Sequence, residues 1–530
     1  IVIATPARAG AARRSHMNPL HQRRSGILLH PTSLPGPHGH GDLGPEAHEF
    51  LRFMARAGQS LWQMLPVVPP GGGDSPYDSP SSFAGSPELV SLRYLVEDGL
   101  LDAADLAAPA RLRDCDRARY GAAKQFRARR LHKAFRRFQS GVARQGLEDL
   151  RERERFWLAD YALFAAIKQH RRGEPWFHWP SELRRREPGA LDAARAQLGD
   201  EVAYHEFVQL LFDRQWQRLR SHAQHLGVLL LGDIPMFVAH DGADVWQHQQ
   251  LFQLDEAGER RCVAGVPPDY FSADGQRWGN PLYDWQRLRD TGYAWWIERL
   301  RGNLRRFDAL RLDHFIGFHR YWEIPPHSPS ARDGRFVEVP GQDFFSKVQS
   351  VLGELPFIAE DLGIVTPEVE RLRDDFNMPG MRVLAFAFAD GAQAYLPHHF
   401  HRRCVVYTGT HDNDTMRGFL DAAERAIHPH EREQLLRQRE RALAYAGSDG
   451  REPHWDLIRS ALASVADTAI FPLQDVLGQG TEARMNVPGT PSGNWGYRVK
   501  AGLLSSSVAA KLTRLTETYE RLPSSLRREP

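Results

Sequence analysis

The stretch GVLLLGDI at residues 227–234 is a strand-sized apolar run that ends in an acid, and it decides the fold. Seven similar short runs occur along the chain, at residues 26–30, 61–68, 309–312, 356–359, 381–388, 404–407 and 468–472. Apolar residues at helical spacing separate most of these runs. Eight buried strands alternating with helices are typical of a parallel barrel surrounded by helices. We therefore expect an α/β fold built as a (β/α)8 TIM barrel.

Two gaps between these runs are too long for a single helix. We expect a mainly helical insertion at about residues 87–226 and an irregular loop subdomain at about 237–283, where Gly, Pro, Asp and aromatic residues are frequent. The segment 1–16 lacks an initial Met, is rich in Ala and Arg, and precedes Met17. We interpret it as an extension outside the fold, which leaves residues 17–530 as one interrupted catalytic barrel.

Charge and cysteine content exclude several classes of protein. The 530 residues carry 68 Lys and Arg against 66 Asp and Glu, which disfavours a chain built to hold nucleic acid or an anionic membrane surface. No apolar stretch approaches the roughly 18 residues that a spanning helix needs. Cys115, Cys262 and Cys404 are scattered and do not have metal-ligand spacing, so they predict free thiols in the cytoplasm.

Arginines are unusually dense between residues 111 and 137. A nucleic-acid site of the single-strand type would interleave them with stacking aromatics on a β platform, and these are missing. Acidic residues follow at 148–154. This pattern favours an exposed, salt-bridged helical face.

Four of the expected strands end in acids. Asp233 is the second-to-last residue of the GVLLLGDI run, Asp313 follows residues 309–312, Glu360 follows 356–359, and Asp412 lies just beyond 404–407. A single acid at a strand end is most often a helix cap or a turn residue. In a parallel barrel, however, all four would converge on one funnel, where like charges are costly unless chemistry uses them. The pattern therefore predicts a catalytic site.

The surroundings of these acids differ. Arg311 and Asp313 are two residues apart on a strand and share a face, so the guanidinium favours the ionised carboxylate that a nucleophile requires. A structural ion pair is the competing interpretation. Glu360 follows apolar residues that would raise its pKa, as suits a general acid. His411 and Asp412 would border the same cavity and could hold sugar hydroxyls.

Aromatic residues in predicted loops point to sugar. Tyr77, Tyr270, Phe271 and Trp278 lie in such loops, among 13 Trp in the whole chain, and could stack on sugar rings. Buried loop anchors are the alternative explanation. For four Trp on regular elements we expect ordinary packing: Trp62, Trp216, Trp295 and Trp296. Two carboxylates in an aromatic site are the arrangement that glycoside chemistry uses.

Several long motifs make the chain recognisable. They are GILLHPTSLPG (26–36), GDSPY (73–77), GVPPDYFSADGQRWGNPLY (265–283), RLDHFIGF (311–318), AEDLGIVTPEV (359–369), YTGTHDNDT (407–415) and RMNVPGT (484–490). Over about residues 26–525 the sequence resembles the compact type of the amylomaltase (4-α-glucanotransferase, disproportionating enzyme) family, related to the α-amylase clan. The resemblance implies a retaining enzyme without metal or cofactor.

By this resemblance, Asp313 is the nucleophile, Glu360 the general acid/base and Asp412 the aspartate that stabilises the transition state. The remaining residues whose roles the resemblance supplies are expected to contact substrate: Tyr77, Asp233, Trp278, Arg311, His411, Asn486 and Pro488. Tyr270 and Phe271 lie on a loop that covers the acceptor side in the family. Some members carry a tyrosine before GDSPY that helps form a second glucan site, but glycines occupy residues 71–73 here.

The expected function is transfer of α-1,4-glucan segments between maltooligosaccharides, starch- or glycogen-derived glucans and glucose as acceptor, with no nucleic-acid or membrane partner. Hydrolysis of α-1,4-glucan by the same carboxylates is the alternative, because the sequence does not measure exclusion of water. A non-catalytic glucan-binding protein is disfavoured because Asp313, Glu360 and Asp412 are all present.

Overall fold

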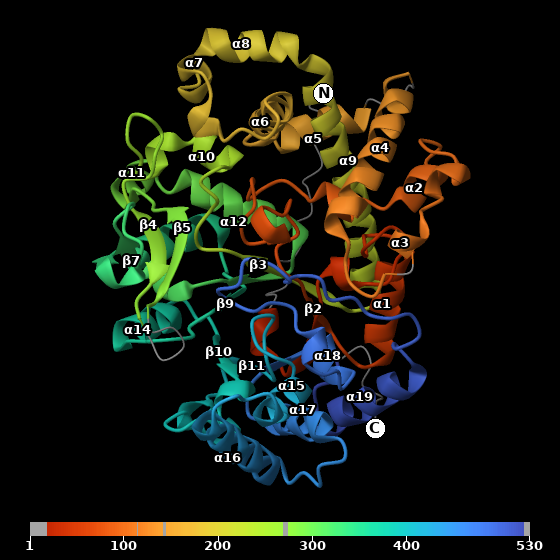
Figure 1. Ribbon diagram of the computed structural model, residues 1–530, viewed down its shortest axis with the longest axis vertical. Helices are drawn as coiled ribbons and strands as arrows, with labels where there is room; N and C mark the ends of the chain where they lie inside the picture. The colour runs from red at the N-terminus through yellow and green to blue at the C-terminus, as the bar shows by residue number, and fades with distance from the viewer. Residues whose placement is uncertain (1–17, 114, 141–144, 269–273, 524–530) are drawn as a thin grey trace, which may run out of the picture.

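A closed barrel of eight parallel strands forms the centre of the molecule (Figure 1). The computed structural model describes residues 18–113, 115–140, 145–268 and 274–523, so the expected extension 1–16 and Met17 lie outside the described residues. The barrel strands are β1 (Arg24–Leu28), β2 (Leu61–Gln63), β3 (Leu229–Ile234), β6 (Ala309–Leu312), β9 (Phe357–Ala359), β10 (Gly380–Val383), β11 (Cys404–Tyr407) and β12 (Thr468–Pro472). Around the barrel their order is β1-β12-β11-β10-β9-β6-β3-β2. The predicted (β/α)8 barrel is confirmed, and each strand overlaps a predicted run, although β1 and β10 begin before theirs.

Burial explains why these segments form strands. Every residue of β6, β9, β11 and β12 is buried, which is the environment of parallel strands covered on both faces. The register of β3 and β6 places Asp233 directly beside Arg311. The barrel therefore brings an acid and a base from distant parts of the chain into contact at its carboxyl end.

Helices around the barrel lead the chain from strand to strand, and the last of them follows β12. They are α1 (Pro45–Arg56), α9 (Gly199–His225), α12 (Ala294–Arg306), α13 (Gly341–Leu352), α14 (Pro367–Asp375), α17 (Pro453–Ala463) and α19 (Ser506–Thr518). Between β10 and β11 the chain uses only short 3-10 turns, at Leu384–Phe386, Gln393–Tyr395 and Pro397–His399. Trp62, Trp216, Trp295 and Trp296 are at most 2% exposed, which confirms that they pack in the core.

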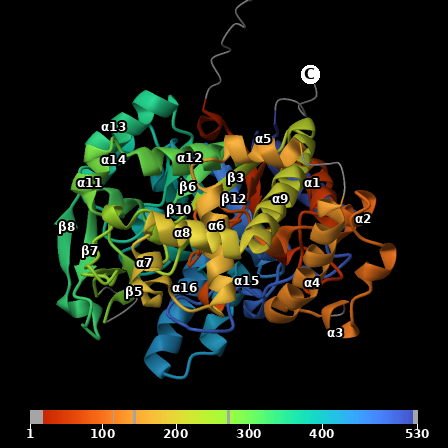
Figure 2. The same ribbon diagram turned by 90° about the horizontal axis from the view of Figure 1, so that it is seen from above.

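The long segment before β3 is helical. Beside α9 it contains α2 (Leu92–Glu97), α3 (Ala110–Arg113), α4 (Tyr120–Gln139), α5 (Gln145–Arg153), α6 (Leu158–His170), α7 (Ser181–Arg184) and α8 (Pro188–Gln197). Figure 2 shows α2 and α4 on the side of the molecule opposite β7 and β8. The arginine-rich α4 is only partly an exposed face, because Arg127 is 1% exposed and pairs with Asp42 at 3.0 Å.

The second inserted region has more regular structure than its composition suggests. It contains α10 (Ala243–Gln247), β4 (Val263–Val266) and β5 (Gln276–Pro281), and α11 (Trp285–Asp290) follows. These strands form an antiparallel sheet of order β5-β4-β7-β8 with β7 (Arg320–Ile324) and β8 (Arg335–Glu338), which come after β6. The sheet was not expected because β4 and β5 are short, contain Gly and Pro, and lack clear alternation.

In the view of Figure 1, α15 (Met416–Leu420) and α16 (Pro429–Ala446) lie in the lower part of the molecule, and α18 (Leu473–Val476) directly follows β12. Among the described residues, none of the helices combines the length and the apolar character that crossing a membrane requires.

Candidate active site

A cleft of about 600 Å³ opens at the carboxyl end of the barrel. It receives the ends of β6 and β9 and the loop after β11, as expected for the catalytic face of this fold. The described site residues that line it are Tyr77, Trp278, Arg311, Asp313, Glu360, His411, Asp412, Asn486 and Pro488. Asp233 does not line the cleft, because its side chain is 0% exposed. Tyr270 and Phe271 lie outside the described residues.

Arg311 is the centre of the charged cluster. Its Nη1 donates to Asp233 Oδ1 at 2.9 Å and Oδ2 at 2.8 Å, and lies 2.8 Å from Asp313 Oδ1. Its Nη2 lies 4.0 Å from Glu360 Oε2. Burial by itself lowers the pKa of Arg311. The facing carboxylates, Asp233 foremost, outweigh that effect and raise the pKa above its usual value, so the guanidinium stays charged. One buried guanidinium thus faces three acidic side chains.

The buried Asp233 orients the guanidinium of Arg311. Burial raises the pKa of Asp233, Arg311 opposes that shift, and the nearby Asp313 adds to it. The Tyr77 hydroxyl donates to Asp233 Oδ2 at 2.8 Å. Asp233 was expected to contact substrate, but in this arrangement its carboxylate is already enclosed by Tyr77 and Arg311.

Glu360 is the more buried of the two candidate catalytic acids. Its side chain is 12% exposed, against 28% for Asp313. Burial raises the pKa of Glu360 to about 8; Arg311 opposes the rise and Asp313 adds to it. The direction agrees with the expectation drawn from the apolar residues before Glu360. At neutral pH this carboxyl therefore retains its proton, as a general acid requires.

Backbone amides fix the orientation of Glu360. The N–H of His314 donates to Oε2 at 2.7 Å and the N–H of Leu362 donates to Oε1 at 3.1 Å. His314 has φ 52°, a left-handed conformation that is uncommon for residues other than glycine. This turn directly after Asp313 aims an amide at Glu360, so it couples the two acids through the backbone. His314 stood inside the quoted RLDHF motif, but nothing in the sequence indicated its conformation.

Asp412 is held from the other side of the cleft. Asn486 Nδ2 donates to Asp412 Oδ1 at 2.6 Å, and His411 Nε2 lies 3.4 Å from Oδ2. Arg484 Nη2 donates to the backbone oxygen of Asp412 at 2.6 Å. Because the side chain is still 43% exposed, its carboxylate is both oriented and open to the cleft.

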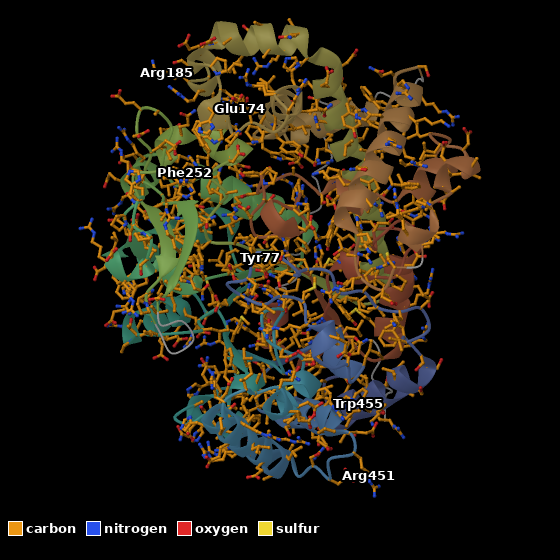
Figure 3. The ribbon with its side chains drawn as sticks, viewed as in Figure 1. Tyr77, Glu174, Arg185, Phe252, Arg451 and Trp455 are labelled. Atoms are coloured by element: carbon orange, nitrogen blue, oxygen red, sulfur yellow. The ribbon has the colours of Figure 1, made fainter. Side chains whose placement is uncertain are left out.

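Aromatic rings form the wall of the cleft between Asp412 and the acids around Arg311. The ring of Tyr77, near the middle of the molecule in Figure 3, stacks on His411 with a centroid separation of 5.1 Å and an interplanar angle of 17°. Trp495, whose centroid lies 5.7 Å from that of Tyr77, extends the wall. Trp278 is 39% exposed and meets the ring of His314 edge-on at 4.9 Å. Exposed indole at the cleft edge favours sugar stacking over the role of a buried anchor.

Asp475 on α18 is a residue that the sequence analysis missed. The Thr408 hydroxyl donates to its Oδ2 at 2.6 Å and the Met416 N–H donates to Oδ1 at 2.7 Å. Asp475 therefore ties both ends of the loop that carries His411 and Asp412. Burial raises the pKa of Asp475 to about 6. The sequence could have indicated Asp475 by its position, because it follows a barrel strand, as the other four acids do.

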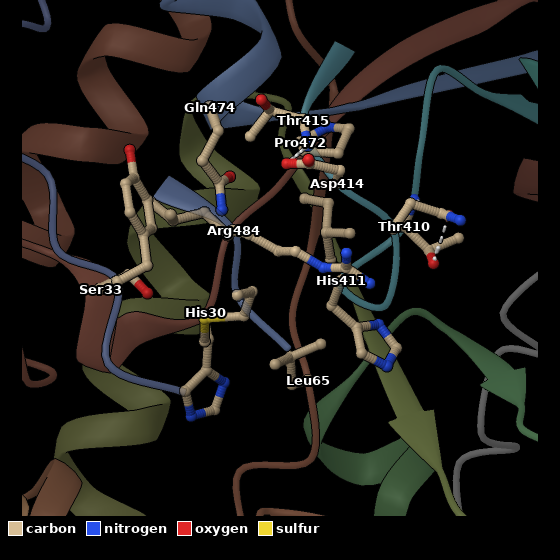
Figure 4. Close-up of a pocket in the computed structure, with 15 residues that line it drawn as sticks. His30, Ser33, Leu65, Thr410, His411, Asp414, Thr415, Pro472, Gln474 and Arg484 are labelled. Atoms are coloured by element: carbon tan, nitrogen blue, oxygen red, sulfur yellow. Dashed lines mark hydrogen bonds between the residues drawn. The ribbon is translucent and has the colours of Figure 1, made fainter. Parts of the chain in front are cut away.

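A small cavity lies behind the same loop (Figure 4). His30, His411, Asp414 and Arg484 are among its lining residues, and its volume is about 20 Å³. That volume suits one water molecule and excludes a sugar ring. Figure 4 shows the Arg484 side chain extending toward the loop of Thr410 and His411. The cavity belongs to the support of the loop rather than to the substrate cleft.

Comparison with known proteins identifies the family. A family model described as 4-alpha-glucanotransferase matches residues 29–505. The 4-alpha-glucanotransferase of Thermus thermophilus is 50% identical over 509 residues, which cover 94% of this chain and 99% of the relative. The 4-alpha-glucanotransferase of Synechocystis is 45% identical over 512 residues, covering 95% and 99%.

The fold comparison agrees. The structure of amylomaltase from Streptococcus agalactiae in complex with acarbose matches with a TM-score of 0.90 and 35% identity, covering 95% of this chain and 100% of that one. Sequence and fold agree over nearly the whole length. The chain belongs to the 4-alpha-glucanotransferase family.

Proposed function

We propose that the chain transfers α-1,4-glucan segments from a donor maltooligosaccharide to the 4-hydroxyl of an acceptor glucose or glucan, by a retaining double displacement. The observation that carries this proposal is the contrast between two acids on one guanidinium. Asp313 pairs with Arg311 at 2.8 Å, whereas burial raises the pKa of Glu360 to about 8. One ionised and one protonated carboxyl group are what the first step requires.

In the first step, Asp313 attacks the anomeric carbon of the donor while Glu360 gives its proton to the departing glycosidic oxygen. The bond from Asp313 to carbon forms as the glycosidic bond breaks, and the shortened glucan leaves with a new hydroxyl. The charge on Glu360 that remains after proton transfer is stabilised by two backbone amides and by the Arg311 guanidinium.

In the second step, Glu360 takes the proton of the acceptor 4-hydroxyl as that oxygen attacks the anomeric carbon. The bond to Asp313 breaks, its carboxylate is released to Arg311, and the product keeps the α configuration. Two inversions at one carbon therefore give retention. We assign Asp412 the stabilisation of the transition state, because Asn486 and His411 orient its exposed carboxylate.

The other site residues take different proposed roles according to where they lie. We propose that His411, Arg311, Asn486, Tyr77 and Pro488 contact the sugars around the reacting bond, all from the cleft wall. Trp278 would offer its exposed ring as a stacking surface at the edge. The buried Asp233 acts through Arg311 and Tyr77, so we assign it a positioning role in the arrangement described.

Transfer rather than hydrolysis requires that an acceptor sugar reaches the intermediate ahead of water. We propose that the inserted region 237–283 covers the acceptor side, with Tyr270 and Phe271 on its loop, and that residues 87–226 form a separate helical insertion. The relatives named 4-alpha-glucanotransferase support transfer over the hydrolytic alternative.

We infer that the substrates are maltooligosaccharides and α-1,4-glucans derived from starch or glycogen, with glucose as an acceptor, and that no nucleic acid or membrane takes part. The bound acarbose of the Streptococcus agalactiae amylomaltase supports the saccharide class. The reaction is proposed for the cytoplasm, where the free thiols of Cys115, Cys262 and Cys404 would stay reduced.

Maltotriose alone tests the proposal. The purified chain should convert it to glucose and longer oligosaccharides while the total number of reducing ends stays constant. Maltose and glucose with rising reducing ends would assign hydrolysis instead. No change in the sugars would leave only binding and overturn the proposed activity.

A further inference from the structure

A second cavity, of about 410 Å³, lies away from the catalytic cleft and shares no lining residue with it. We call it the arginine cavity and define it by Arg153, Arg220, Arg305, Arg306, Trp157 and Gln217. Arg305 and Arg306 come directly before β6, whereas Asp313 directly follows that strand. The arginine cavity is therefore at the amino end of the barrel and the cleft is at the carboxyl end.

Two of the four arginines in this cavity are matched by its acids. Arg153 Nη2 lies 2.7 Å from Asp213 Oδ2, and Arg153 Nε lies 3.2 Å from Glu154 Oε1. Arg305 Nη2 lies 2.7 Å from Glu154 Oε2. Trp157 Nε1 also donates to Glu154 at 2.8 Å. The two acids and these two arginines balance in charge, and Glu154 already accepts from three donors.

A third arginine is matched outside the lining. Arg220 Nη2 lies 2.9 Å from Asp308 Oδ1, while its Nη1 donates to the backbone oxygen of Arg305 at 2.7 Å. The other oxygen of Asp308 accepts from the N–H of Leu230 at 2.9 Å, at the start of β3. Arg220 is thereby fixed against the barrel and adds no surplus charge.

Arg306 is the surplus charge. Among the described residues its guanidinium has neither a hydrogen bond nor an ion pair, and its Cζ lies 5.4 Å from the ring centroid of Phe212. Burial lowers the pKa of Arg306, and Glu154 and Asp213 offset that shift only in part, so its surroundings oppose the charge. A guanidinium offers five N–H donors, and leaving the half-buried Arg306 without a hydrogen-bond partner costs free energy. An anion in the cavity would remove that cost.

We propose that the arginine cavity binds a phosphate monoester of a sugar-sized alcohol, with Arg306 as the group that receives the phosphate. Phosphate oxygens match the planar donor pattern of guanidinium groups. The volume falls within the range of small-molecule sites and exceeds what a bare phosphate needs. Trp157, Phe83 and Gln217 supply apolar and amide surface for the organic part.

Isothermal titration calorimetry on the full chain tests the proposal, with glucose 6-phosphate as the probe and inorganic phosphate and glucose as separate titrations. Arg306→Gln removes the surplus charge. Gln217→Glu adds a carboxylate at an exposed position, where folding is not at risk. The control is Arg514→Gln, which makes the same charge change at an exposed residue of α19 that does not line the cavity.

The expected result is saturable, one-to-one binding of glucose 6-phosphate that weakens about tenfold or more in Arg306→Gln and in Gln217→Glu, and is unchanged in Arg514→Gln. All three variants should keep the transfer activity on maltotriose, which reports an intact fold. Equal binding of inorganic phosphate would overturn the organic ligand class, and equal binding of glucose would place the contact at the catalytic cleft. Absence of saturable binding, or equal weakening in all three variants, would overturn the site.

Discussion

Arg311 Nη1 lies 2.8 Å from Asp313 Oδ1, and the same nitrogen holds the carboxylate of Asp233. The proposed nucleophile thus shares a guanidinium with a buried acid whose side chain is 0% exposed. Asp313 therefore faces a guanidinium at close range, whereas burial raises the pKa of Glu360 to about 8. The proposed chemistry at the cleft would therefore depend on an ion pair inside the barrel wall.

Asp313→Asn should abolish turnover and leave the fold intact. Asparagine has similar size but is a poor nucleophile, so transfer on maltotriose should fall by about 10⁴-fold or more. Because Asp313 is 28% exposed and Arg311 keeps Asp233, the free energy of unfolding should change by no more than about 1 kcal/mol. Asp192→Asn, at a side chain 77% exposed, is the matched control. Retained turnover in Asp313→Asn would reassign the nucleophile.

The proton on Glu360 should set the alkaline limit of activity. With its pKa raised to about 8, the acid form is lost as the pH rises through that value, so kcat/KM should fall with a midpoint near 8. The measurement is a pH profile with maltotriose and, in parallel, with an α-maltosyl fluoride donor. Fluoride departs without a proton, so formation of the glycosyl-enzyme from that donor should not show this limb. The same limb for both donors would contradict the assignment.

The same pKa predicts a pH-dependent stability. The folded-state pKa of Glu360, about 8, lies above the usual value of 4.5, so its protonation stabilises the fold below about pH 4.5 and this contribution is lost as the pH rises toward 8. Glu360→Gln cannot ionise. The Tm of that variant relative to the unaltered chain should therefore increase between pH 5 and pH 8. An unchanged difference would show that Glu360 does not titrate in this range.

Arg311→Met should destabilise the fold strongly. It leaves Asp233 buried and unpaired, which typically costs about 3–5 kcal/mol in unfolding free energy. Urea unfolding measures the loss. Arg195→Met breaks a pair whose side chains are 44% and 77% exposed, and should cost less than about 1 kcal/mol. Equal costs for the two variants would mean that the buried pair does not carry the stability assigned to it.

Asp475 should affect catalysis without touching substrate. Asp475→Asn weakens the hold on Thr408 and Met416, the ends of the loop that carries Asp412. We expect kcat to fall by up to about 10²-fold with a smaller change in KM, because misplacing a catalytic group costs on that order. Thr408→Val removes one of the two bonds and should give an intermediate loss. An Asn variant with normal kcat would reduce Asp475 to a structural residue.

The sequence predicted the barrel well because each of its strands is buried on both faces and stands out as an apolar run. Four acids were found for the same reason, since strand ends are easy to locate. The four-stranded sheet was missed because β4 pairs with β7, which comes after β6 in the chain, and local patterning does not report such pairing. Where this sheet lies relative to Glu360 and Asp313 can be read only from the three-dimensional structure.

The sequence also did not predict which distant segments contact each other. Tyr77 stacks on His411, and Asn486 bonds to Asp412, across more than 70 positions of sequence in each case. The burial that raises the pKa of Glu360 depends on the closed barrel around it. Asp233 was expected at the cleft surface, and only the packed structure shows that Tyr77 and Arg311 enclose it.

During transfer, a glycosyl group should become covalently bound to Asp313. Glu360→Gln incubated with α-maltotriosyl fluoride should form this intermediate and accumulate it, because the departing fluoride needs no acid and the second step lacks its base. Intact-protein mass spectrometry followed by peptide mapping should find one maltotriosyl group, on the peptide that contains Asp313. A sugar on any other residue, or release of β-configured product with no adduct, would contradict the account.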